Sequence, residues 1–209
     1  MLGRAGAAIV LLGRDSPDCG RAAFCGTDGH DIGEALARAL GAALSSQADA
    51  GAGALYDSDP HRQARWTAFR DELLSTTRVA LLREVSWSGR VDARALLQRE
   101  LEKYPRMAGW ALLDAAPVSA RPVGQPVVPR DAVLVLYSDE VAALAWLRGG
   151  AAAAVVVPDA VQIARRGLAM ATELARGAEL QLREERIAPL IVTPQTLDQY
   201  ESRWSAVED

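Results

Sequence analysis

Short apolar runs alternate with amphipathic segments along most of the chain. The runs are bounded by Gly, Pro or charged residues, a pattern typical of buried strands. They predict strands at 9–12, 54–56, 78–84, 107–113, 132–137, 151–157 and 187–192, of which the second is weak. The intervening segments have apolar residues at helical spacing and predict helices at 31–44, 61–76, 91–104, 141–147 and 161–176, with a charged linker at 178–185 and a closing helix or tail at 194–204.

The centres of the predicted strands are continuously apolar, as in Ala132 to Tyr137, and do not alternate with polar residues. Strands of this kind are buried on both faces, which occurs in parallel sheets covered by helices on each side. The pattern therefore predicts a soluble α/β protein with a doubly wound parallel sheet.

Polar residues follow several of the predicted strands. Arg14 and Asp15 come after the first strand, Asp114 closes the strand at 107–113, and Asp28 precedes the first helix. Ligands of open α/β sheets bind just beyond the carboxyl ends of the strands, so these positions are candidates for a site. For Arg14 two interpretations remain, a ligand contact and a solvated arginine at a strand end. Asp28 is better explained as a helix cap than as a ligand contact.

Composition and charge argue against a nucleic-acid partner. The 209 residues include 23 Lys and Arg against 27 Asp and Glu, a net charge of −4, whereas binding to phosphates needs clustered positive charge. No apolar run approaches the roughly 18 residues of a membrane span. The first twelve residues are better explained as a strand than as a signal peptide, so we expect no export signal in this chain.

The sequence offers no recognisable catalytic or metal site. Cys19 and Cys25 are six positions apart, which fits neither a redox pair nor a zinc site, and we expect two free or buried thiols. Asp28, His30 and Asp31 match no established metal spacing and are explained by a capped, solvated helix start. No serine stands in a nucleophile motif, and no acid/base pair stands out. We therefore predict no enzyme, no cofactor and no metal.

Several short motifs occur in an order that resembles a known family. They are D-S-P-D at 15–18, G-T-D-G at 26–29, R-W-T-A-F at 65–69, Y-P-R-M-A-G-W at 104–110, the segment 158–177, and P-L-I-V-T-P-Q-T-L-D-Q-Y at 189–200. This succession resembles the sugar-binding proteins of bacterial ABC transporters, the periplasmic binding proteins of the ribose type, which share a fold with LacI-family regulators. The resemblance covers nearly the whole chain.

The resemblance implies two α/β lobes that close over a sugar at a hinge. It assigns 1–27 and 158–186 to a remnant of the amino-terminal lobe with the hinge segments, 28–157 to the carboxyl-terminal lobe, and 187–209 to a closing strand and tail. The first strands and helices of the family have no counterpart here, so we expect one complete lobe plus part of a second. The helix that the family has after Asp114 is replaced by a Pro-rich stretch.

The resemblance also implies which residues face the ligand: Arg14, Arg65, Asp114, and Ser138 or Asp139. Guanidinium and carboxylate groups suit sugar hydroxyls because both can form paired hydrogen bonds. For Arg65 the alternative is an ion pair on the helix surface with Asp71 or Glu72. Trp66 and Trp87 could stack on a sugar ring, although Trp66 is better explained as part of the core.

Two functions remain at this stage. The first is a non-enzymatic module that binds a sugar or polyol and presents it to an ABC permease or a sensor, located by resemblance in the periplasm or cell envelope, or in the cytoplasm if the chain is the complete product. The second is a truncated lobe that forms a homodimer without binding sugar, so that a partner covers a sheet edge and apolar surface.

Overall fold

The computed structural model describes residues 8–13, 19–47, 49–87, 93–114, 132–138, 140 and 143–205. Contacts between these residues divide the chain into two compact units. Unit 1 comprises the described parts of 1–28 and 158–189, and unit 2 comprises those of 29–157 and 190–209. Each unit has its own sheet.

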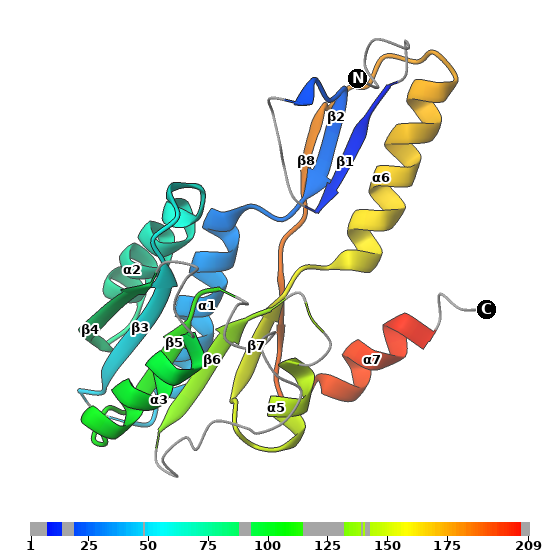
Figure 1. Ribbon diagram of the computed structural model, residues 1–209. Coiled ribbons are helices and arrows are strands. Elements are labelled where there is room, and N and C mark those ends of the chain that lie inside the picture. Colours follow the sequence, from blue (N-terminus) through cyan, green and yellow to red (C-terminus); the bar gives the residue numbers. More distant parts are fainter. Residues whose placement is uncertain are drawn as a thin grey trace. The chain divides into compact units, whose positions relative to one another are not determined.

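Unit 2 is built on a six-stranded sheet with the strand order β4-β3-β5-β6-β7-β9 (Figure 1). The strands are β3 (Gly51–Asp57), β4 (Ala80–Trp87), β5 (Gly109–Leu112), β6 (Val133–Tyr137), β7 (Ala154–Val157) and β9 (Leu190–Val192). Neighbours are parallel except β9, which runs antiparallel to β7. Because β4 lies on one side of β3 and β5 on the other, the direction of winding reverses between β3 and β5. Doubly wound sheets bind ligands at such a switch point.

Helices cover both faces of this sheet. They are α1 (Gly29–Ala43), α2 (Gln63–Thr76), α3 (Ala93–Lys103), α5 (Leu144–Arg148) and α7 (Leu197–Ser205). Phe69 of α2 packs with Ala111 of β5 in one core, and Leu97 of α3 packs with Leu112 of β5 in the other. Successive residues of one strand thus enter opposite cores, which explains the continuous apolar runs. The predicted doubly wound sheet is confirmed.

Unit 1 contains a three-stranded parallel sheet in the order β1-β2-β8. Its elements are β1 (Val10–Gly13), β2 (Ala23–Gly26), β8 (Glu184–Arg186) and the helix α6 (Ala160–Ala175). Ala23 and Cys25 of β2 pack against Ile163 and Met170 of α6. The Asp159 side chain accepts a hydrogen bond from the backbone N–H three residues later and caps this helix.

Strand β8 corrects the expectation of a charged linker at 178–185. It pairs in parallel with β2, although its three residues are all charged. Each of them forms an ion pair within unit 1: Glu184 with Arg21, Glu185 with Arg166, and Arg186 with Asp28. The residues of this strand therefore make ion pairs, and the strand lacks the run of buried apolar residues by which other strands were predicted.

Two expectations from composition agree with the structure. Cys19 is exposed and Cys25 is buried, and both are free thiols. Across the described part of the chain, no helix combines the length and the apolar character that crossing a bilayer requires.

Helices α1 and α2 approach each other closely at Gly33. A Cβ atom at this position would lie 2.2 Å from the carbonyl oxygen of Arg65 and 2.8 Å from the backbone nitrogen of Phe69. Both are backbone atoms and cannot rotate away, so only glycine permits this approach. Gly33 thereby helps to set the position of Arg65 over the sheet.

We predict that Gly33→Ala lowers the free energy of unfolding by about 1–3 kcal/mol, because the added methyl group forces the two helices apart. Gly29→Ala is the matched control. The same substitution in the same helix places the methyl group 3.7 Å from the backbone nitrogen of Arg65, an ordinary contact. Urea unfolding followed by circular dichroism measures both. Equal effects of the two substitutions would contradict the prediction.

Candidate functional site

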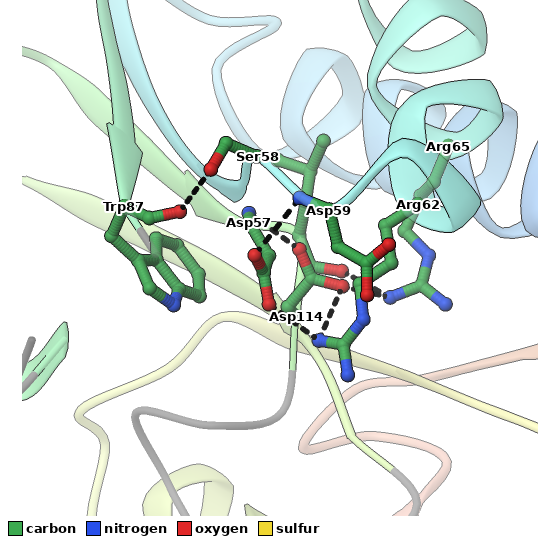
Figure 2. A network of polar contacts seen from close by, with 8 residues as sticks. Asp57, Ser58, Asp59, Arg62, Arg65, Trp87 and Asp114 are labelled. Carbon is green, nitrogen blue, oxygen red and sulfur yellow. Dashed lines mark hydrogen bonds and ion pairs between the residues drawn. The ribbon is translucent and has the colours of Figure 1, made fainter. Parts of the chain in front are cut away.

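The carboxyl ends of β3 and β5 bring two aspartates together at the switch point of the unit 2 sheet. The strands pair in parallel with Leu55 beside Leu112, so Asp57 and Asp114, each two residues further on, stand side by side. The backbone N–H of Asp57 donates a hydrogen bond of 2.9 Å to Asp114 Oδ2. Figure 2 shows the network that surrounds them.

Asp114 is the buried centre of this network. Its side chain is 1% exposed, and its Oδ1 accepts a hydrogen bond of 2.6 Å from Arg65 Nη1 and lies 3.2 Å from Arg62 Nη1. A buried carboxylate is costly unless it is paired and hydrogen-bonded, and here both requirements are met.

Arg65 lies near the beginning of α2 and reaches Asp114 from there. Its Nη1 also donates to the carbonyl oxygen of Leu113 at 2.7 Å, and its guanidinium carbon lies 4.2 Å from the centre of the Tyr137 ring, a cation–π contact. The side chain is 13% exposed. The structure thus brings two of the candidate residues from the sequence, Arg65 and Asp114, into direct contact.

The alternative for Arg65, an ion pair on the helix surface with Asp71 or Glu72, is wrong. Asp71 forms an ion pair with Arg70 at 3.0 Å, and Glu72 forms one with Arg38 at 3.3 Å. Arg65 instead points toward the sheet. Its Nε is buried and has no hydrogen-bond partner among the described residues, so the guanidinium is not fully satisfied.

Asp57, Arg62 and Tyr137 belong to the same network and were missed from the sequence. Arg62 ends the short 3-10 turn η3 (Pro60–Arg62), and its Nη1 lies 3.3 Å from Asp57 Oδ2. Asp57 Oδ1 accepts a hydrogen bond from the N–H of Asp59 at 3.1 Å. The signal for Asp57 was its place at the end of a strand, the same signal that singled out Asp114.

Ser138 lies at the carboxyl end of β6, next to Tyr137. Its side chain is fully buried, and its hydroxyl oxygen accepts a hydrogen bond of 3.0 Å from the N–H of Glu140. Arg14 and Asp139 lie outside the described residues, as does the Pro-rich stretch after Asp114. The structure therefore places Asp114 and Ser138 at the ends of the neighbouring strands β5 and β6, and the Arg65 guanidinium reaches Asp114 from α2.

Three other residues considered from the sequence make contacts that belong to the fold or are buried in it. Trp66 is buried and stacks on Tyr56 with ring centres 4.2 Å apart, so it is part of the core. Trp87 is also buried. Asp28 forms an ion pair of 2.8 Å with Arg186.

At the start of α1, His30, Asp31 and Glu34 have side-chain ligand atoms within 4.8 Å of one another. Glu34 also lies 3.5 Å from His30 Nδ1 and forms an ion pair with Arg38.

The pKa of Asp114 depends on two opposing effects. Burial raises it above the ordinary value of a carboxyl group, and the charge of Arg65, the hydrogen bond from Asp57 and the charge of Arg62 offset this only in part. The folded chain therefore holds the Asp114 proton to a higher pH than the unfolded chain does. The stability gained from protonation is complete below the unfolded pKa and is lost as the pH rises through the folded pKa.

We predict that the free energy of unfolding of the native chain, minus that of Asp114→Asn, falls as the pH rises above about 4, the ordinary carboxyl value. The other carboxylates are present in both proteins, so the subtraction removes their contribution to the pH dependence. Asparagine cannot titrate, so the difference that remains reports on Asp114. Urea unfolding at a series of pH values measures the difference. Asp71→Asn, at an exposed carboxylate of α2, is the matched control. A difference for Asp114 that rises with pH would show that the arginines outweigh burial.

The fold as a whole is similar to solved sugar-binding proteins. AraP, an arabinose binding protein from Geobacillus stearothermophilus, is 17% identical with a TM-score of 0.80, over 95% of this chain and 72% of that one. The sugar-binding protein of a Bacillus halodurans sugar ABC transporter is 20% identical with a TM-score of 0.79, over 95% and 73%. An ABC transporter solute binding protein from Bacillus halodurans C-125 with bound myo-inositol is 15% identical with a TM-score of 0.74, over 97% and 71%.

No protein-family model and no curated protein matches the sequence. Identities of this size establish a shared fold. The chain spans between 71% and 73% of these three structures, in agreement with the expectation that part of the family's fold has no counterpart here. The chain has the α/β fold of the sugar-binding proteins of ABC transporters, as its motifs predict.

Proposed function

We propose that this chain is a non-enzymatic module that binds a sugar or polyol. The observation that carries the proposal is the convergence of Arg65 and Asp114, with Asp57 and Arg62, at the switch point of the unit 2 sheet. Structures with this fold hold D-arabinose, D-allose and myo-inositol, all neutral polyhydroxy compounds.

The chemistry of the site suits such a ligand. The carboxylates of Asp57 and Asp114 contact the guanidinium groups of Arg62 and Arg65, so the formal charges of these four groups cancel and favour no charged ligand. Carboxylate oxygens accept from sugar hydroxyls and guanidinium groups donate to them. On the resemblance alone we also propose Arg14, and Ser138 or Asp139, as ligand contacts.

We further propose that unit 1 is a remnant of the amino-terminal lobe, and that the chain delivers its ligand to an ABC permease or a sensor in the periplasm or cell envelope. One structure of similar fold is a complex of XylFII with LytSN, so a protein with this fold has been found bound to a second protein.

The homodimer alternative receives less support from the sheet edge. Strand β4 is an edge strand of unit 2, and its register with β3 shifts so that Leu82 has no partner residue. Such bulges discourage edge-to-edge pairing.

A calorimetric titration with D-arabinose, D-allose and myo-inositol tests the proposal. We predict that at least one of them binds and raises the melting temperature in a dose-dependent manner. Arg65→Ala should weaken this binding about 10-fold or more, because hydrogen bonds from a charged group contribute roughly 1.5–3 kcal/mol. Arg70→Ala is the matched control, an exposed arginine of the same helix whose partner is Asp71.

Light scattering on the same samples covers the homodimer. A stable dimer whose melting temperature no sugar changes would contradict the proposed function and support the alternative. A monomer that binds sugar would exclude the homodimer alternative.

A further inference from the structure

Arg62 occupies an unusual position for an arginine. It is the N-cap residue of α2, and its side chain makes no capping hydrogen bond. Its backbone is helical and ends the 3-10 turn η3 that leads into α2, where the positive end of the helix dipole repels a cation. The helix therefore gives no reason for arginine here. The two carboxylates that Arg62 Nη1 approaches do give one.

The contacts of Arg62 are looser than those of Arg65. Its Nη1 lies 3.3 Å from Asp57 Oδ2 and 3.2 Å from Asp114 Oδ1, whereas Arg65 Nη1 is 2.6 Å from the same Asp114 oxygen. Hydrogen bonds between ions normally measure about 2.7–2.9 Å. The Arg62 side chain is also 32% exposed, against 13% for Arg65. Arg65 is thus held more closely by Asp114 than Arg62 is; Figure 2 shows both side chains beside this carboxylate.

Arg62 covers the acceptors that an external ligand would need. Asp57 Oδ1 and Asp114 Oδ2 accept from the backbone N–H groups of Asp59 and Asp57. The oxygens that remain are Asp57 Oδ2 and the side of Asp114 Oδ1 that Arg65 leaves open. Within the described part of the chain, Arg62 is the side chain that lies against both.

We infer that Arg62 acts as an internal ligand, which occupies the place of a sugar hydroxyl pair between Asp57 and Asp114 and leaves it when a polyol binds. This inference rests on the proposed function and adds to it the residue that limits affinity. The hydroxyls must replace a cation, so binding carries the cost of separating Arg62 from two carboxylates. Removal of the Arg62 charge removes that cost.

Calorimetric titration of Arg62→Ala with D-arabinose, D-allose and myo-inositol tests the inference. We expect this variant to bind the preferred compound about 10-fold more tightly than the native chain, a change of about 1.4 kcal/mol. Arg62→Met, which keeps the length of the side chain without its charge, should behave alike and covers the case in which the alanine variant does not fold. Arg70→Ala should bind as the native chain does. Equal or weaker binding by both Arg62 variants would overturn the inference.

Methylguanidinium separates this inference from the proposed function. In Arg62→Ala the small cation should fill the space between the two carboxylates, and it should therefore raise the melting temperature and compete with the sugar. In the native chain it should have none of these effects. If no variant binds any sugar but methylguanidinium stabilises Arg62→Ala alone, Arg62 fills a cation site between the two carboxylates, but the proposed function fails and the inferred displacement by a polyol fails with it. If methylguanidinium has no selective effect on Arg62→Ala, the internal ligand is overturned, whether or not sugar binds.

Discussion

The buried carboxylate of Asp114 places the strictest demand on unit 2. A charge with 1% exposure is tolerated only with partners, and its partners come from three separate segments. The backbone N–H of Asp57 comes from the end of β3, Arg62 from the turn that follows, and Arg65 from α2. Strand pairing, turn and helix packing must all be correct before this charge is compensated. The site is therefore also a test of the fold around it.

In the proposed function this network is the ligand-binding site, and some of its groups are held more firmly than others. Arg65 is held by Asp114, by the carbonyl of Leu113 and by the ring of Tyr137, so its orientation is set before any ligand arrives. Arg62 is held less tightly and faces solvent more. In the inferred mechanism, a rigid donor beside a displaceable one keeps the carboxylates paired in the empty site, at the cost of affinity when a ligand binds.

Much of the fold was predictable because burial on both faces leaves continuous apolar runs, and such runs are local. Each failure also has a physical cause. Strand β3 was a weak prediction because Gly51 and Gly53 interrupt its apolar run. Both positions are glycine because the side chains of Leu82 and Trp110 fill the space that a Cβ atom would need. Strand β8 was missed because its charged residues are paired with distant partners, and no local pattern records that.

The sequence by itself determined the doubly wound sheet, the strand end that carries Asp114, and the helix motif that carries Arg65. Only the tertiary structure decided that these two residues pair, that Asp57 and Arg62 join them, and that Asp71 and Glu72 do not. The physical reason is distance along the chain. Arg65 and Asp114 are 49 residues apart, and they meet through the register of β3 with β5 and the close approach of two helices at Gly33.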